Sequence, residues 1–165
     1  MNGGLVRQKD HEGRITTMAQ KSTAATQGTT ARPSLTARDI MQKPVVAATA
    51  RASLRDVATE LVKNGFSGMP VADPDGRVIG VVTESDIVRT LIAGKRLENL
   101  TAGEVMTGPP ITVEVEAPIE EVMKQLEENR IVRVPVTDHD KLVGIISRGD
   151  IIRAILEPEF MEFGV

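Results

Sequence analysis

The sequence contains no cysteine, no tryptophan and no tyrosine, and it has only three phenylalanines in 165 residues. Without cysteine the chain can form no disulfide, offers no thiolate to a metal and has no thiol nucleophile. Aromatic side chains stack on the bases of single-stranded nucleic acids, so their scarcity argues against nucleic acid as a partner. The core is therefore expected to consist of aliphatic side chains.

The chain also lacks a strong charge imbalance and a long apolar run. Its net charge is −3, which does not favour a polyanionic partner. No apolar stretch approaches membrane-spanning length, so we expect a soluble protein with no membrane partner. The absence of cysteine fits a reducing compartment, and we predict a cytoplasmic location.

Residues 1–34 differ in composition from the rest of the chain. The stretch 18–34 is rich in Thr, Ala, Ser, Gln and Gly and has almost no large apolar residue, which predicts a flexible tail. No acidic residue lies between Glu12 and Asp39, a feature of organelle import signals. A flexible tail is the favoured interpretation, and organelle import is the alternative.

Beyond residue 34 one sequence unit occurs twice. Equivalent residues lie 65 positions apart before a predicted turn and 64 apart after it: Met41 and Met106, Pro70 and Pro135, Gly80 and Gly144, Asp86 and Asp150. So constant an offset indicates a duplication. We predict repeats at 35–97 and 98–156, followed by a tail, 157–165, that is either a frayed end or an extra contact.

Each repeat has the pattern of a β-α-β-β-α unit. Short strands are predicted at 45–47 and 111–113, helices from Ser53 and Pro118, a hairpin after each helix, and closing helices after Thr83 and Ser147. One unit alone has too small a core, so the two are expected to pack as a pseudo-two-fold pair with a cleft between them. The predicted fold class is α/β, of the α+β type.

Two matched segments lie where a buried strand ends and a helix begins: Thr83-Glu84-Ser85-Asp86 and Ser147-Arg148-Gly149-Asp150. Thr or Ser followed three residues later by Asp is typical of a helix cap, and this explains either copy alone. A carboxylate has two acceptor oxygens, so in a cleft it can also bind both hydroxyls of a diol such as that of ribose. One Asp can serve both purposes.

These residues carry a family resemblance. The pattern Gly80-Val81-Val82-Thr83 with Asp86, repeated as Gly144-Ile145-Ile146-Ser147 with Asp150, resembles the cystathionine β-synthase (CBS) domain. A tandem pair of such domains is called a Bateman module. The resemblance covers about residues 35–156, and it includes the repeat openings and the second-strand entries: Asp39-Ile40-Met41, Gly103-Glu104-Val105-Met106, Ser67-Gly68-Met69-Pro70-Val71 and Val132-Arg133-Val134-Pro135-Val136.

The resemblance implies a regulatory module that senses AMP, ADP, ATP or S-adenosylmethionine and requires no cofactor. It implies that the ribose is bound by the matched hydroxyl and carboxylate residues, Thr83, Asp86, Ser147 and Asp150. It implies that the base is enclosed by two sets of residues, Val46, Ala47, Phe66, Ser67 and Met69, and Ile111, Thr112, Ile131, Val132 and Val134.

The arginines make the two copies unequal. Repeat two has Arg133 and Arg148, with Arg130 nearby, where repeat one has Gly68 and Glu84 at the positions of the first two. A guanidinium suits a phosphate and a carboxylate repels it, so we expect a charged nucleotide to prefer the Arg133 side. Phosphates can also cross the cleft, which leaves open a site built from both halves.

We find no motif for catalysis or for a metal. His11 and His139 lack partner motifs, and no phosphate-binding glycine loop is present. We therefore expect a ligand sensor rather than an enzyme, acting through a protein partner or its own oligomer. A ligand-independent dimerisation or adaptor module is the alternative. Apolar helical residues predict a homodimer: Ile87, Val88, Leu91 and Ile92, and Ile151, Ile152, Ile155 and Leu156.

Overall fold

The structure is a computed structural model that describes residues 8–9, 15–16 and 35–162. Strands β1 (Gln8–Lys9) and β2 (Ile15–Thr16) pair antiparallel within a separate unit, residues 1–32. Apart from these two strands, the predicted flexible tail, 1–34, lies outside the described residues. Within the described part of the chain, no helix is both long and apolar enough to cross a membrane.

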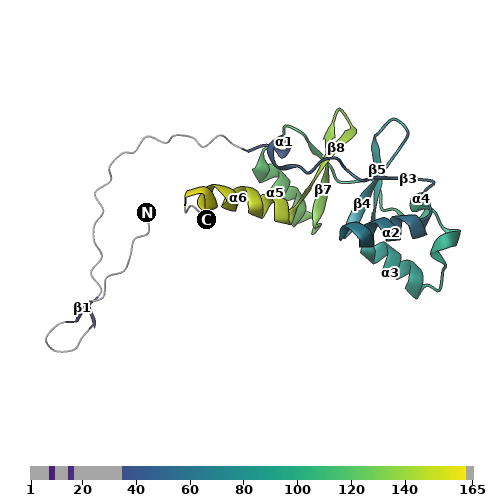
Figure 1. Ribbon diagram of the computed structural model, residues 1–165, viewed down its shortest axis with the longest axis horizontal. Coiled ribbons are helices and arrows are strands. Elements are labelled where there is room, and N and C mark those ends of the chain that lie inside the picture. Colours follow the sequence, from purple (N-terminus) through teal and green to yellow (C-terminus); the bar gives the residue numbers. More distant parts are fainter. Residues whose placement is uncertain (1–7, 10–14, 17–34, 163–165) are drawn as a thin grey trace. The chain divides into compact units, whose positions relative to one another are not determined.

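Residues 35–162 repeat one order of elements twice (Figure 1). The first copy comprises β3 (Ala48–Thr49), α2 (Leu54–Asn64), β4 (Gly68–Ala72), β5 (Val78–Thr83) and α3 (Glu84–Ile92). The second comprises β6 (Val113–Glu114), α5 (Ile119–Glu128), β7 (Arg133–Asp138), β8 (Lys141–Ser147) and α6 (Arg148–Glu162). The predicted β-α-β-β-α order and mixed fold class are confirmed. A short helix precedes each copy, α1 (Ala37–Ile40) and α4 (Ala102–Val105), and a 3-10 turn, η1 (Leu97–Asn99), precedes α4.

Each copy forms a three-stranded sheet, in the orders β3-β4-β5 and β6-β7-β8. The middle strand pairs parallel with the short first strand and antiparallel with its hairpin partner. The first strands begin later than predicted, at Ala48 and Val113 rather than Val45 and Ile111, because parallel pairing starts only there. The strand predicted at 45–47 is therefore wrong, and the one at 111–113 is right only for its last residue.

The core consists of two clusters, and each cluster includes the opening of the other copy. Buried residues of α1 and Met41 pack with the second copy, in a cluster that includes Val122, Val134, Val136 and Ile146. Residues of α4 and Met106 pack with the first copy, in a cluster that includes Leu54, Val57, Val71 and Val82. Because the openings are exchanged, neither copy completes its core without the other.

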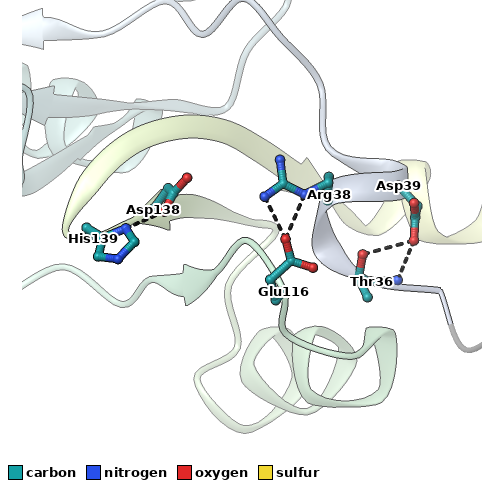
Figure 2. A network of polar contacts seen from close by, with 6 residues as sticks. All are labelled: Thr36, Arg38, Asp39, Glu116, Asp138 and His139. Atoms are coloured by element: carbon teal, nitrogen blue, oxygen red, sulfur yellow. Dashed lines mark hydrogen bonds and ion pairs between the residues drawn. The ribbon is translucent and has the colours of Figure 1, made fainter.

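Polar contacts hold the exchanged openings in place. The backbone N–H of Ala37 donates to the carbonyl of Ala117 at 2.8 Å, and that of Ala102 donates to Ala52 at 2.9 Å. Figure 2 shows Arg38 of α1 pointing toward Glu116 of the second copy, where its Nε lies 2.7 Å from Oε1. The opening of repeat one is therefore joined to repeat two by backbone and side-chain contacts.

Two strand glycines allow this exchange. A Cβ atom at Gly144 of β8 would collide with the side chain of Met41, and one at Gly80 of β5 would collide with Met106. Each methionine therefore lies directly on the strand backbone of the other copy, which is a reason for glycine within a strand.

We expect Gly144→Ala to lower the free energy of unfolding by about 1–3 kcal/mol, because the added methyl group overpacks the Met41 contact. Gly149→Ala is the matched control, since its Cβ would approach no atom closer than 3.6 Å. Alanine is also the better helix former, so this variant should be neutral or slightly stabilised. Urea unfolding measures both, and equal stability of the two variants would contradict the packing argument.

Candidate functional site

Two cavities lie between the copies, and we name each after the carboxylate that lines it. The Asp86 cavity has a volume of about 510 Å³, and the Asp150 cavity has about 200 Å³. The eleven residues that line the Asp150 cavity all have their repeat counterparts in the lining of the Asp86 cavity. The cavities are therefore two versions of one site.

Each cavity combines the carboxylate of one copy with apolar residues of the other. Thr83 and Asp86 of the first copy face Ile111, Ile131 and Val132 of the second. In the Asp150 cavity, Ser147 and Asp150 lie with Val46 and Phe66 of the first copy. The sequence left open whether a site is built from both halves. Both cavities are lined by residues of both copies.

The other predicted site residues occupy different places. Ser67 lines the Asp86 cavity beside Thr83 of its own copy. Met69 and Val134 are buried in the two core clusters. Ala47 and Thr112 are not among the residues that line the two cavities. Arg148 also lies outside both linings, and its Nε donates to the carbonyl of Ile131 at 3.1 Å.

The Asp86 side chain is held at the start of α3 by a reciprocal cap. Its Oδ2 accepts hydrogen bonds from the backbone N–H of Thr83 at 2.9 Å and from its hydroxyl at 2.6 Å. The backbone N–H of Asp86 donates back to the Thr83 hydroxyl at 3.3 Å. The carboxylate is only 4% exposed, and its Oδ1 accepts from Arg89 at 3.1 Å. The helix-cap interpretation is thus confirmed for this copy.

The Asp150 side chain has the same cap but a different second partner. Its Oδ2 accepts from the backbone N–H of Ser147 at 2.8 Å and from the hydroxyl at 2.6 Å. Its Oδ1 accepts from Nε2 of Gln42, which belongs to the opening of the first copy, at 3.0 Å. Arg153, the counterpart of Arg89, lies at 3.8 Å. The two carboxylates therefore differ at one oxygen only.

Arg133 lines both cavities. Its Cζ lies 5.2 Å from the ring centroid of Phe66, within range of a cation–π interaction. Burial lowers the pKa of Arg133, while Asp150 and Glu84 act in the opposite direction. Its Nε is buried and has no hydrogen-bond partner in the described part of the chain. A partly desolvated guanidinium with an unused donor is suited to an anionic group.

Sequence reasoning missed some of the residues that line the cavities. Arg89 follows Asp86 by one helical turn, and Ser85 directly precedes Asp86. Gln42 and Thr107 each follow the methionine of a repeat opening, so the repeat offset was a signal that could have identified them. Among the described residues, no group of three or more His, Asp or Glu side chains could hold a metal ion.

The fold and the paired cavities define a tandem module built from one duplicated ligand-binding unit. The model of the CBS domain family matches residues 37–93 and 102–157, one match in each copy, so the chain belongs to the CBS domain family. It is 33% identical over 129 residues to hypoxic response protein 1 of Mycobacterium tuberculosis, covering 78% of this chain and 90% of that protein.

Solved structures of CBS pairs have the same fold. The CBS domain pair of protein MJ0100, in complex with 5′-methylthioadenosine and S-adenosyl-L-methionine, is 30% identical with a TM-score of 0.68, covering 76% of this chain and 99% of that one. The CBS domain protein PAE2072 from Pyrobaculum aerophilum, complexed with AMP, is 29% identical with a TM-score of 0.68, covering 75% and 97%.

We expect Asp86→Asn to lower the free energy of unfolding by about 1–2 kcal/mol, because the cap of α3 loses its charged acceptor. Asp56→Asn is the matched control: Asp56 also lies in the first turn of a helix, but it is exposed. The control should change stability by less than about 0.5 kcal/mol. Chemical denaturation without ligand measures both, and equal losses would argue against a capping role for Asp86.

Proposed function

We propose that this CBS pair is a regulatory module that binds an adenosine-containing ligand, such as AMP, ADP, ATP or S-adenosylmethionine, in the Asp86 cavity. The observation that carries the proposal is the combination of a capped carboxylate, an apolar wall and three arginines around one space of about 510 Å³. This volume falls within the range of about 300–1,000 Å³ that is usual for small-molecule sites. The ligands of the related structures support the same ligand class.

The ribose is assigned to Asp86. Its Oδ2 is fixed by Thr83, whereas its Oδ1 is bonded to Arg89, whose side chain is 76% exposed. Because Arg89 is a long and mostly exposed side chain, it can move into solvent, and a ribose diol can then take its place at Oδ1. Asp86 then keeps its cap while it accepts hydrogen bonds from the ligand.

The base is assigned to the apolar wall of the second copy. Ile111 and Ile131 are partly buried, and Val132 is 50% exposed. A purine that covers these side chains removes apolar surface from water, which favours binding. Because the wall is aliphatic, affinity for the base depends on buried area rather than on ring stacking.

The phosphate is assigned to the arginines of this cavity. Arg89, Arg130 and Arg133 line it, against the single carboxylate of Glu84 besides Asp86. The balance of charge near the cavity therefore suits an anionic group. Since Arg133 lines both cavities, it is Arg89 and Arg130 that favour the Asp86 cavity for a charged nucleotide.

We expect Arg133→Ala to weaken AMP binding about 10- to 100-fold, because a charge-assisted hydrogen bond contributes about 1.5–3 kcal/mol. Adenosine, which has no phosphate, should bind both proteins within about twofold. Arg77→Ala, in the exposed hairpin turn, is the control and should leave both ligands unaffected. Isothermal titration calorimetry checks this, and an equal loss for adenosine and AMP would contradict the phosphate assignment.

The module signals ligand binding through a change in the relative arrangement of its two copies. A ligand in this cavity contacts both copies, so it favours the relative arrangement in which both sets of contacts form. We propose that the module acts in the cytoplasm, through its own dimer or a protein partner. Thr83 and Asp86 have binding and capping roles in this proposal, and no catalytic step is assigned to them.

We also propose a homodimer formed through α3 and α6. The two helices expose apolar side chains at equivalent positions, Val88, Leu91 and Ile92 on α3, and Ile152, Ile155 and Leu156 on α6. Ile87 and Ile151, which the sequence grouped with them, instead contact the two cores. Exposed apolar residues concentrated on two related helices favour a self-complementary interface with a second copy.

Replacing Ile92 and Ile155 together by Glu should convert the dimer to a monomer, because the interface would bury unpaired carboxylates. Val62→Glu is the control: Val62 is 82% exposed on α2, outside the proposed interface, and its variant should remain dimeric. Size-exclusion chromatography with light scattering gives the masses. A monomeric parent protein at micromolar concentration would refute the dimer. A dimer that binds neither AMP nor adenosine would instead support the adaptor function.

A further inference from the structure

We infer that Gln42 determines which of the two cavities binds the ligand. Its amide occupies the carboxylate of Asp150, so the chain has one working adenosyl site, beside Asp86. This inference rests on the proposed function, because it concerns how the two versions of that site came to differ.

Gln42 and its repeat counterpart Thr107 have equivalent backbone positions. The N–H of Gln42 donates to the carbonyl of Ile145 at 2.8 Å, and the N–H of Ile145 donates back at 3.2 Å. Thr107 makes the same pair of bonds with Val81, at 2.9 and 3.0 Å. Each residue is therefore held beside the strand that leads to a binding carboxylate, and only the side chains differ.

The length of the side chain decides what happens at the carboxylate. Gln42 reaches Oδ1 of Asp150 at 3.0 Å. In the part of the chain that the structure describes, no hydrogen bond joins the Thr107 hydroxyl to Asp86. The duplication thus supplies an internal comparison of two side chains at one matched backbone site.

A ribose would meet different hydrogen-bond partners at the two carboxylates. At Asp150 both oxygens already accept hydrogen bonds, Oδ2 from Ser147 and Oδ1 from Gln42. A diol would have to displace an amide whose backbone is anchored on β8. At Asp86 it displaces Arg89, whose charge can then pair with the phosphate of the ligand, whereas the neutral amide of Gln42, which is also exposed, gains no partner of that strength.

Cavity volume agrees with this difference. The Asp150 cavity, at about 200 Å³, falls below the usual range for small-molecule sites, whereas the Asp86 cavity lies within it. Gln42 lines the smaller cavity, so its side chain fills part of that space in addition to occupying Oδ1 of Asp150. Phe66 and Ile145, whose counterparts are Ile131 and Val81, are also bulkier residues in that lining.

The test counts binding sites by isothermal titration calorimetry, with AMP and S-adenosylmethionine as probes. The parent chain should bind one equivalent, and Asp86→Asn should weaken that binding at least tenfold. Gln42→Thr, which copies the residue at position 107, should bind two equivalents. Adding Asp150→Asn to Gln42→Thr should return the count to one and so locate the second site.

The reciprocal variant, Thr107→Gln, should weaken binding beside Asp86 at least tenfold by bringing an amide to that carboxylate. Phe66→Ile is the matched control for cavity volume, since it copies Ile131 and leaves the amide in place; it should gain no second equivalent. Melting temperatures measured without ligand establish that each variant is folded.

Two equivalents bound by the parent chain would overturn the inference, as would one equivalent bound by Gln42→Thr. If Phe66→Ile gained a second site and Gln42→Thr did not, the Phe66 ring rather than the Gln42 amide would be what prevents binding in the Asp150 cavity. That result would also overturn the inference. Binding of neither probe by any folded variant would overturn the proposed function itself.

Discussion

The packing of each opening methionine on a strand glycine of the other copy is the contact on which the rest of the structure depends. Met41 lies on Gly144, and Met106 lies on Gly80. These contacts complete the two cores, and they also bring the segments after each methionine alongside the carboxylate of the opposite copy. The cavities are therefore a product of the same exchange that stabilises the fold, and a change that loosens one should loosen the other.

Local features of the site could be predicted from the sequence, and long-range ones could not. The junctions at Thr83 and Ser147 were recognisable because a cap involves residues only three apart. The exchange of openings was not, because a constant repeat offset is equally compatible with an opening that packs on its own copy. The same limit explains the strand wrongly predicted at 45–47: its apolar residues suit a strand, yet Val45 and Val46 line the Asp150 cavity.

Burial at the start of β7 is a second feature that the sequence pattern does not predict. Val132, Arg133 and Val134 are consecutive, but Val134 is in the core, Val132 is half exposed, and Arg133 lies between the cavities. Alternation along a strand predicts that neighbours point to opposite faces. It does not predict which face meets a cavity, since this depends on the other copy. The buried Nε of Arg133 has no partner in the part of the chain that the structure describes, which is costly to the isolated fold. Such a cost is expected where function rather than stability selects the residue.

Duplication imposes symmetry on the backbone and leaves the side chains free to diverge. The paired hydrogen bonds of Gln42 and Thr107 use only main-chain atoms, so they tolerate any side chain except proline. The positions beside the two carboxylates can therefore change without cost to the exchanged cores. Two copies are needed for folding, because each completes the other, but only one carboxylate has to bind the ligand. A difference confined to side chains at matched positions is the result that these two requirements together predict.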